Sequence, residues 1–375
     1  MNIKLVVLCC WANTILNCAD AITPGGKRQA PGLIPLNPVG IYGSLDTALK
    51  CMQMVRQQAG GTLNFADTLP NCLRIAYHDS SARNTTSPGG ANGSIMNELD
   101  DPLNNPGNLG LAICHAYLKA LVPLMRNNGT GPCAKLTFAD AIQWVAEVAV
   151  ELAGGPATPM LPGREDCGCF DNTNIIADEC APATDLISFW SEAGMTDPVK
   201  ASAALSGSHS LGNIRSTTAH DAANGAGFGG AGPVCIGSPG PMTAQPNVFD
   251  NHYFKEIYNQ NGRAGYLYSD RNLAAINAST LDYVKEYAND DDAFFRDWVP
   301  QFQEMSLLGV DPKPAGFNIT SGFLPGGIIA KKLPMVPEDN IGFTGTAADF
   351  THPARLNGRL SQSGGQGSFL VAGGH

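Results

Sequence analysis

The stretch 138–153, which reads FADAIQWVAEVAVELA, constrains the fold more than any other because apolar residues dominate it from end to end. Its apolar residues recur with the three- and four-residue spacing of a helix. It is followed by Gly154-Gly155-Pro156, a combination that stops a helix. The segment therefore predicts the most apolar helix of the chain and favours a fold built on helices.

Helical spacing recurs along most of the chain, whereas no long stretch alternates apolar and polar residues with the period of two that strands show. Ser44 is placed to cap the helix that follows it. We therefore predict a mainly α protein. Beyond about residue 311, Pro, Gly and small polar residues predict a loop-rich C-terminal tail, 311–375. The other predicted helices cover residues 45–55, 66–79, 109–126, 184–193, 197–211, 250–260, 279–288 and 292–308.

Composition narrows the class of protein. The chain has 375 residues, 43% hydrophobic and 15% charged, so it can bury a core and is not a disordered polyelectrolyte. Its 23 Lys and Arg against 33 Asp and Glu give a formal net charge of −10. Proteins that bind nucleic acid carry a basic surface, so this balance argues against such a partner.

The N-terminus has the pattern of a secretory signal peptide over residues 1–21. Lys4 precedes an apolar run, and Ala19-Asp20-Ala21 fits a small-x-small cleavage site. The alternative is a buried N-terminal helix. The signal predicts a secreted protein, and the absence of any later run of about 18 apolar residues predicts no membrane span. Acceptor patterns for N-glycosylation stand at Asn84, Asn92, Asn128, Asn277 and Asn318.

Removal of residues 1–21 leaves eight cysteines, an even number that suggests up to four disulfides in an oxidising compartment. Metal ligation is the alternative, but the pair Cys167 and Cys169 has no partner pair at the spacing of a zinc site. Disulfides are therefore the favoured interpretation. The eight are Cys51, Cys72, Cys114, Cys133, Cys167, Cys169, Cys180 and Cys235.

Two segments carry residues that suit catalysis. In LRIAYHDS at 73–80, Arg74 and His78 are four residues apart, so they share one face of a helix. The imidazole can take and return a proton, while the permanently charged guanidinium stabilises an anion. In LSGSHSLG at 205–212, small residues beside His209 would let a flat group approach the backbone. Each segment has a structural alternative: a solvated pair on a helix surface, and a core histidine with a hydrogen bond.

A third segment, FDNHYFKE, precedes LYSD, in which Asp270 could fix the tautomer of a metal-bound histidine. In chain order the motifs are R-x-x-x-H-D at 74–79, GGANGSI at 89–95, GGP and PGRED between 154 and 166, LSGSHSLG, GPMTAQPNVFDNHYF at 240–254, and LYSD. This series, over residues 45–310, resembles the haem peroxidase superfamily of plants, fungi and bacteria, of the secretory type with a proximal segment similar to that of ascorbate and cytochrome c peroxidases. The resemblance implies haem b between two mainly helical lobes, a distal one at about 45–155 and a proximal one at about 156–310.

The resemblance assigns a role to each matching residue. His209 is similar to the proximal iron ligand and Asp270 to its carboxylate partner. His78 would be the distal acid and base, and Arg74 would stabilise the departing oxygen of hydrogen peroxide. The hydrogen-bond chain that keeps His78 basic falls on Asn104, with Glu98 before it, and Asn108 is a second candidate for the same position.

Several positions depart from the family pattern, and each departure narrows the range of possible electron donors. Met242 stands where ascorbate and cytochrome c peroxidases carry a proximal Trp, and Thr218 stands where an Arg binds ascorbate. The acidic manganese cluster of some fungal members falls on Asp67 and Asn71, and the exposed Trp used against lignin falls on Ala204. These differences argue against ascorbate, manganese and lignin, and they favour small phenols or aromatic amines.

The resemblance implies further binding residues. Around the cofactor it places Tyr77, Arg164, Met242 and Phe249. Beside the proximal helix it implies one cation, K⁺ or Ca²⁺, on oxygens of Ser210, Thr243, Gln245, Val248 and Asp250. The distal calcium site of secretory members needs an Asp where this chain has Asn92, so we expect that site to be weak or missing. Cys51 and Cys133 fall where secretory members have a disulfide.

The expected function is that of a secreted haem peroxidase that reduces hydrogen peroxide with small aromatic donors and has neither nucleic acid nor membrane as a partner. The alternative is a non-catalytic haem-fold glycoprotein with a binding or structural role. A metal hydrolase that uses His78 and Asp79 is excluded by spacing, because the nearest other histidine is His115 and the H-E-x-x-H pattern does not occur.

Overall fold

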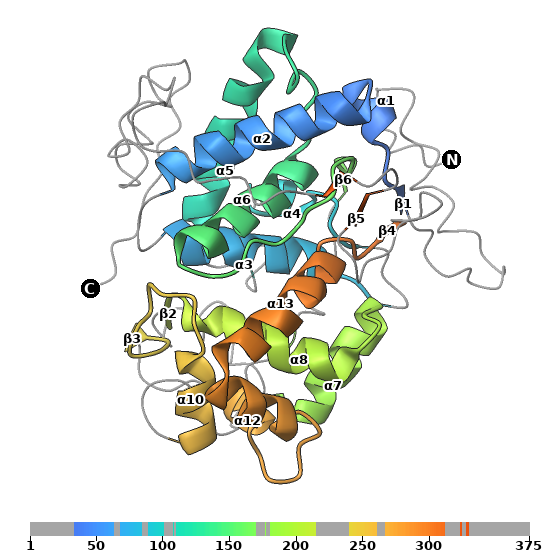
Figure 1. Ribbon diagram of the computed structural model, residues 1–375. Helices are drawn as coiled ribbons and strands as arrows, with labels where there is room; N and C mark the ends of the chain where they lie inside the picture. The colour runs from blue at the N-terminus through green and yellow to red at the C-terminus, as the bar shows by residue number, and fades with distance from the viewer. Residues whose placement is uncertain are drawn as a thin grey trace, which may run out of the picture.

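The protein is described by a computed structural model for residues 34–63, 68–84, 89–100, 108, 110–169, 177, 181–214, 240–260, 267–311, 323–324 and 328–329. It is mainly helical, which confirms the predicted fold class. The upper helices in Figure 1 are α1 (Pro38–Tyr42), α2 (Leu45–Thr62), α3 (Thr68–Ser81), α4 (Ile95–Glu98), α5 (Ala112–Arg126) and α6 (Phe138–Leu152). The second half of the chain forms α7 (Ala183–Ala193), α8 (Pro198–Ser206), α10 (His252–Asn259), α11 (Tyr268–Leu273), α12 (Leu281–Asn289) and α13 (Asp291–Met305), with 3₁₀ turns η4 (Asn127–Gly129) and η6 (Gly207–Ser210).

The strands among the described residues are short, and they pair in twos. The parallel pair joins β1 (Ile34–Pro35) to β4 (Val310–Asp311), with Ile34 opposite Val310, so the start of the described chain lies beside the segment that follows α13. The two antiparallel pairs are β2 (Asn213–Ile214) with β3 (Gly240–Pro241), and β5 (Phe323–Leu324) with β6 (Ile328–Ile329).

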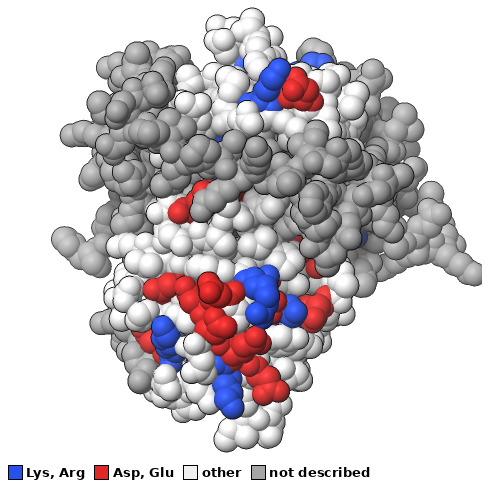
Figure 2. All heavy atoms as spheres, viewed as in Figure 1, with Lys and Arg blue, Asp and Glu red and all other residues white. Residues whose placement is uncertain are grey.

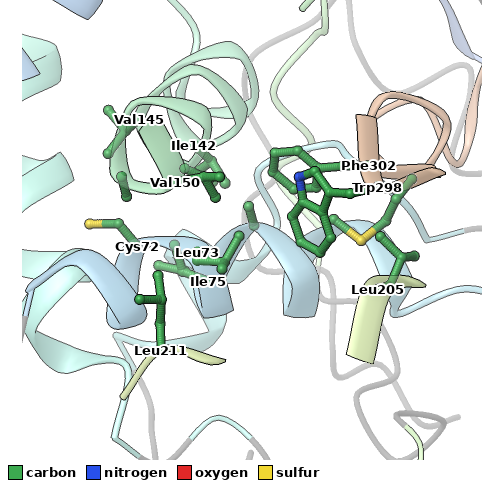
Figure 3. Packing of buried hydrophobic residues seen from close by; sticks show 14 of the residues in the cluster. Cys72, Leu73, Ile75, Ile142, Val145, Val150, Leu205, Leu211, Trp298 and Phe302 are labelled. Atoms are coloured by element: carbon green, nitrogen blue, oxygen red, sulfur yellow. The ribbon is translucent and has the colours of Figure 1, made fainter. Parts of the chain in front are cut away.

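Helix α6 is the buried helix that the sequence predicted. Every residue from 139 to 150 is buried, and the helix packs against α2 and α3. The hydroxyl of Thr137 caps it by accepting from the Asp140 N–H at 3.1 Å. Figure 3 shows α6 side chains such as Ile142 facing Leu73 of α3 across the core. This contact fixes α3, the helix that carries Arg74 and His78.

Aromatic side chains of α13 extend the same core into the second half of the chain. Phe294, Trp298 and Phe302 have no exposed surface. Phe294 packs edge-on against Phe254 of α10, with ring centroids 4.8 Å apart. Figure 3 shows Trp298 and Phe302 next to Leu205 of α8. One buried cluster therefore runs from α2 through α6 and α3 to α13 and α10.

The helix predicted over 197–211 divides at Gly207 into α8 and the tighter turn η6. A Cβ on Gly207 would come within 2.4 Å of Phe294 Cζ, so the glycine is needed for packing against α13. Gly212 has φ +94° and lies so close to Pro70 of α3 that a Cβ would be 2.9 Å from the proline Cβ. Close packing of protein on protein thus explains both glycines beside His209. The approach of a flat group to the backbone there stays a prediction.

Three disulfides lie among the described residues. Cys51 is bonded to Cys133, as the resemblance implied, and Cys72 of α3 is bonded to Cys114 of α5. The third disulfide joins Cys167 to Cys169. Cys180 and Cys235, like the predicted signal segment 1–21 and most of the predicted tail, lie outside the described residues.

The surface carries mixed charge. On the face in Figure 2, acidic side chains gather over the lower helices with lysines and arginines among them, and Arg296 pairs with Glu286 at 2.9 Å. The glycosylation acceptor proposed at Asn92 is wrong, because that side chain is 6% exposed and accepts a hydrogen bond from the Ser94 N–H. In the described part of the chain, no helix has the length and hydropathy that crossing a membrane requires.

Candidate active site

Helix α3 presents Arg74 and His78 on one face. Its other neighbours, such as Leu73 and Ile75, are buried, whereas Arg74 is exposed and His78 keeps 7% of its surface. Arg74 Nε donates a hydrogen bond to His78 Nε2 over 3.1 Å. Because Nε2 accepts this bond, the ring proton of the neutral imidazole lies on Nδ1. The predicted pairing at helical spacing is therefore present.

A chain of buried side chains fixes this tautomer. His78 Nδ1 lies 2.9 Å from Asn108 Oδ1, and Asn108 Nδ2 donates to Glu98 Oε2 over 2.9 Å. Glu98 Oε1 in turn accepts from Ser94 Oγ at 3.0 Å. The contact expected of Asn104 is thus made by Asn108, the second candidate, while Asn104 lies outside the described residues.

The environment of His78 opposes its protonation. Burial and then the charge of Arg74 lower the pKa of His78 to about 3, and the hydrogen bond to Asn108 offsets only part of this shift. The imidazole is therefore neutral at physiological pH, with the lone pair of Nε2 beside the Arg74 guanidinium. A neutral base next to a fixed positive charge can accept a proton from a ligand and hold the resulting anion.

His209 lies in η6, directly after α8, and it is paired with a buried carboxylate. Its Nδ1 lies 2.9 Å and 3.1 Å from the two oxygens of Asp270, at the start of α11. Burial disfavours the charged form of His209, but the charge and hydrogen bond of Asp270 outweigh it and raise the pKa of the imidazole. Since Nδ1 donates to Asp270, Nε2 has a free lone pair for a metal ion.

Tyr253 of α10 is a third member of this group that the sequence reasoning missed. Its hydroxyl donates to Asp270 Oδ1 over 2.8 Å, and its ring lies edge-on to that of His209 with centroids 6.0 Å apart. Burial and the Asp270 charge raise the pKa of Tyr253 well above its ordinary value, so the phenol stays protonated. The FDNHYFKE segment was singled out, but nothing in the spacing indicates which of its residues meets Asp270.

The two groups face each other. Arg74 is close enough for its charge to oppose protonation of His209, and α3 contacts η6. The side chain of His209 keeps 38% of its surface accessible, although Asp270 behind it keeps 4%. Both histidines thus lie at the contact between α3 and η6.

Comparison with known proteins identifies this arrangement. The family model described as "Peroxidase" matches residues 55–290. The chain belongs to the peroxidase family. A probable L-ascorbate peroxidase 3, peroxisomal, from Oryza sativa subsp. japonica is 32% identical over 250 residues, which cover 66% of this chain and 76% of the relative. L-ascorbate peroxidase 2, cytosolic, from Arabidopsis thaliana is 30% identical over 269 residues, which cover 70% of this chain and 94% of the relative.

These findings confirm a haem-dependent peroxidase, and they correct the predicted compartment. Relatives are named as peroxisomal, cytosolic and chloroplastic enzymes, so the prediction of a secreted, secretory-type protein is wrong. They lend no support to the alternative of a non-catalytic glycoprotein. The hydrolase role of Asp79 is also excluded by the structure, since its carboxylate is buried and accepts the Gly93 and Ile95 N–H groups.

The residues present fit the haem that the family implies. The accessible surface of His209 and the exposed side chain of Arg74 lie where α3 faces η6, in an otherwise buried setting. Tyr77 is half-buried there, and the Asp270 charge reaches it and helps to raise its pKa, after the larger effect of burial. Met242 is buried. Its N–H donates to the carbonyl oxygen of Gly212, a residue that follows His209 by three positions.

Two residues predicted to bind the cofactor belong to the core instead. Arg164 is 1% exposed, and its guanidinium bonds Asp140 Oδ1 at 2.9 Å and the carbonyl and hydroxyl of Ser306. Phe249 is 1% exposed and packs against Trp298 with ring centroids 4.7 Å apart. The assignments of Arg164 and Phe249 to the cofactor are therefore corrected: one joins the loop after α6 to the end of α13, and the other packs in the aromatic core.

Proposed function

We propose that the protein reduces hydrogen peroxide to water between α3 and η6, with haem b held by His209. The observation that carries the proposal is the pair of imidazoles whose Nδ1 atoms are both engaged, which leaves the Nε2 lone pair of His209 for a metal ion and that of His78 beside Arg74 Nε. When bound, the haem would supply the electrons that the peroxide bond takes up. Asp270, by accepting from Nδ1, leaves the lone pair of His209 on Nε2, where it would bind the iron, and makes the imidazole a stronger donor.

His78 and Arg74 would handle the proton and the charge. His78 Nε2 would accept the proton from one oxygen of hydrogen peroxide and return it to the other, which would leave as water. Arg74 stabilises the negative charge on that leaving oxygen. In the structure Arg74 Nε bonds His78 Nε2, so peroxide binding replaces this bond with bonds from both groups to the substrate.

The pH dependence of the peroxide reaction should follow His78. With a pKa lowered to about 3, the imidazole remains the free base when the solution is acidified from neutrality, so the rate constant should stay level to about pH 4 and then fall with an apparent pKa near 3. The unfolded chain takes up this proton near the ordinary value of about 6.5, so the same group lowers the free energy of unfolding as pH falls from about 6.5 to 3. Stopped-flow rates with circular dichroism as a folding control measure both effects, and an acid limb near pH 6.5 would contradict the assignment.

Asn108 and Asn104 give a matched pair of variants that test the hydrogen-bond relay, the chain from His78 Nδ1 through Asn108 to Glu98 that fixes the tautomer of His78. Asn108→Ala removes the hydrogen bonds that Asn108 makes to His78 Nδ1 and to Glu98 Oε2. The rate constant for the peroxide reaction should therefore fall by roughly 10–100-fold, as is typical when a residue that orients a functional histidine is removed. Asn104→Ala should react at the parental rate. The reverse pattern would show that Asn104 carries the relay.

We propose ascorbate as the electron donor, because the relatives at 30–32% identity are named L-ascorbate peroxidases. The overall reaction takes one peroxide and two ascorbate molecules to two waters and two ascorbyl radicals. Small phenols are the second candidate, since Thr218 stands where the family's ascorbate-binding Arg falls.

A donor panel on one haem-loaded sample decides between these candidates. Ascorbate, a phenol such as guaiacol, Mn²⁺ and ferrocytochrome c are compared at equal peroxide concentration, in the parent and in Thr218→Arg. The ascorbate proposal predicts the highest turnover with ascorbate in the parent. Turnover with guaiacol alone, together with ascorbate turnover gained in Thr218→Arg, would replace ascorbate by the phenol class.

We also propose a cation, K⁺ or Ca²⁺, beside η6. Ser210 Oγ is buried and finds no hydrogen-bond partner among the described residues, while Thr243 Oγ1 lies 3.3 Å from the Ser210 carbonyl oxygen. The Gln245 N–H donates to Thr243 Oγ1, and the His252 N–H donates to Asp250 Oδ1 over 2.9 Å. Hydroxyl, carbonyl and carboxylate oxygens suit a hard cation. Val248, the remaining expected ligand, is exposed.

The cation should stabilise the fold. At a cation concentration 100 times Kd, binding adds about 2.7 kcal/mol to the free energy of unfolding, and Asp250→Ala should lose most of this increment. Asp282→Ala, which removes an exposed carboxylate of α12, is the control. Thermal unfolding with and without K⁺ or Ca²⁺, plus metal analysis of the dialysed protein, measures the effect. Equal melting temperatures and no bound metal would dismiss the site.

A further inference from the structure

The disulfide between Cys167 and Cys169 differs from the other two in its accessibility. Cys51 and Cys133 are 0% and 1% exposed, and the pair of α3 and α5 is likewise buried. Cys167 and Cys169 are half-buried, and Gly168 between them is exposed. A thiol reductant attacks a sulfur atom directly, so in the native protein it can reach this disulfide while the other two described disulfides are shielded.

This disulfide also contributes little to holding the fold together. A crosslink stabilises a protein chiefly by shortening the loops of the unfolded chain, and the benefit grows with the length of the closed loop. Cys51 and Cys133 are 82 residues apart, whereas Cys167 and Cys169 are two apart. The short ring therefore constrains the unfolded chain far less, and its effect is local.

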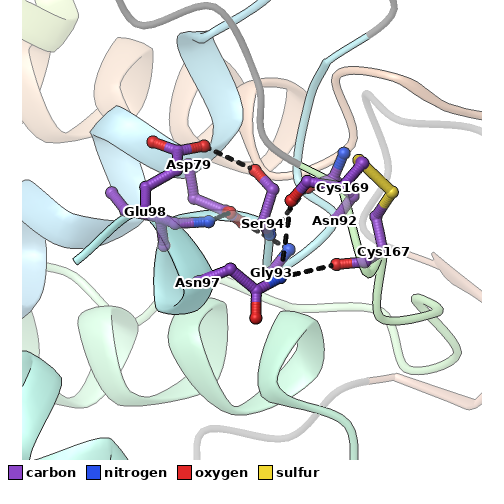
Figure 4. Close-up of a disulfide and its surroundings, with 9 residues drawn as sticks. Asp79, Asn92, Gly93, Ser94, Asn97, Glu98, Cys167 and Cys169 are labelled. Atoms are coloured by element: carbon purple, nitrogen blue, oxygen red, sulfur yellow. Dashed lines mark hydrogen bonds between the residues drawn. A yellow bond between two sulfur atoms is a disulfide. The ribbon is translucent and has the colours of Figure 1, made fainter. Parts of the chain in front are cut away.

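Locally, the disulfide is the anchor for the segment from Asn92 to Glu98. Asn97 Nδ2 donates to the carbonyl oxygens of both cysteines, at 3.2 Å and 3.4 Å. The Cys167 N–H donates to the Asn92 carbonyl oxygen over 2.8 Å. Figure 4 shows these residues around the disulfide, with Asp79 of α3 on the other side of the same segment. The two cysteine carbonyls are held together by the ring, so that one amide can bond both.

The segment from Asn92 to Glu98 includes the carboxylate at the end of the hydrogen-bond relay that starts at His78 Nδ1. Asn92 Oδ1 accepts from the Ser94 N–H at 2.9 Å, and Ser94 Oγ donates to Glu98 Oε1. Glu98 then holds Asn108, and Asn108 holds His78 Nδ1. Hydrogen bonds thus connect the disulfide continuously to the distal imidazole.

We propose that Cys167 and Cys169 form a reversible thiol–disulfide site that sets the rate of the peroxide reaction through this relay. The proposal rests on the proposed role of His78. A dithiol reduces the disulfide: two S–H groups form on the cysteines, and the dithiol leaves as its own disulfide, with two electrons and two protons transferred. Hydrogen peroxide restores the bond: one cysteine thiolate is oxidised to the sulfenic acid with release of water, and the second thiol displaces a second water.

The direction of control follows from the contacts. Reduction frees the two cysteine carbonyls to separate, so Asn97 loses one or both bonds and the Asn92–Glu98 segment becomes less ordered. Asn108 then fixes the Nδ1–H tautomer of His78 less firmly, and the peroxide reaction slows. The oxidised state is the fast one, so exposure to peroxide raises the rate at which the enzyme removes it.

The test compares the haem-loaded full chain before and after treatment with dithiothreitol, which is removed by gel filtration before the assay. Labelling of free thiols and peptide mass analysis should show Cys167 and Cys169 becoming modified, while the two buried disulfides, Cys51–Cys133 and Cys72–Cys114, stay intact. Amide hydrogen exchange over residues 92–98 should accelerate, and the rate constant with peroxide should fall by about tenfold, as for loss of a residue that supports a functional histidine. Incubation with peroxide should restore both values.

The double variant Cys167→Ser/Cys169→Ser separates the switch from other effects of the reductant. It should match the reduced parent in exchange and rate, and it should not respond to dithiothreitol. A disulfide map that pairs either cysteine elsewhere, or reduction that leaves exchange over 92–98 unchanged, would overturn the proposal. Absence of any peroxide reaction in the oxidised parent would instead refute the proposed function, because thiol labelling and hydrogen exchange are measured independently of turnover.

Discussion

His78→Ala is expected to react with hydrogen peroxide about 10⁴-fold more slowly than the parent, because it loses a general acid and base, worth about 10²–10⁴-fold, and misplaces the substrate. The alanine removes the neutral base that lies beside Arg74 on α3. It also removes the hydrogen bond between His78 Nδ1 and Asn108 Oδ1. The guanidinium remains and can still attract an anion, so binding should suffer less than the reaction itself.

Stopped-flow absorption with increasing peroxide measures this loss as the slope of rate against concentration. Lys50→Ala is the control, since that exposed side chain of α2 pairs with Asp46 and belongs to neither proposed site. The control should react at the parental rate. If His78→Ala keeps most of the rate, His78 is not the acid and base, whatever the haem content of the sample.

Asp270→Asn is expected to raise the reduction potential of the bound haem iron by about 65–130 mV. A hydrogen bond to a charged acceptor contributes about 1.5–3 kcal/mol. When the ferric state loses this whole contribution, the free energy corresponds to a change in reduction potential of about 59 mV per 1.4 kcal/mol for a one-electron couple. The neutral amide accepts more weakly from His209 Nδ1, so the imidazole donates less to the iron and the ferric state is less stabilised. Spectroelectrochemical titration of the loaded protein measures the potential directly.

Tyr253→Phe provides a control of opposite sign. The phenol donates to Asp270 Oδ1 and draws charge from the carboxylate, so its removal leaves Asp270 a stronger acceptor for His209. The potential should therefore fall in Tyr253→Phe while it rises in Asp270→Asn. A shift in the same direction in both variants would mean that general loss of packing, rather than the charge on Asp270, changes the potential.

Local patterns were sufficient for the helices and for contacts along one helix. The apolar stretch of α6 and the cap at Ser44 follow from spacing and side-chain chemistry alone. Arg74 and His78 could be paired because residues four apart on a helix are neighbours. The proximal pair, His209 and Asp270, is 61 residues apart and came from the family resemblance, since no local rule brings such residues together.

Contacts between distant segments could not be derived in this way. Asn104 and Asn108 lie in one stretch between α4 and α5, and only the path of the chain decides which amide reaches His78. Arg164 was assigned to the cofactor from the family resemblance, but Asp140 of α6 supplies its partner inside the core. Gly207 beside His209 is likewise explained by a contact between distant segments, since it packs against Phe294.

The largest error was the prediction that the protein is secreted. A short apolar N-terminal run and an even number of cysteines are both typical of secreted proteins, but neither pattern is specific to them. The relatives, named for peroxisome, cytosol and chloroplast, contradict it.

The central claim is that His209 holds haem on one side while His78 and Arg74 act on peroxide from the other. The absorption spectrum of the haem-loaded protein in the first milliseconds after mixing with hydrogen peroxide tests it most directly. We expect a Soret band that changes within milliseconds in the parent and remains unchanged over that time in His78→Ala. A Soret band that peroxide leaves unaltered in the parent would contradict it.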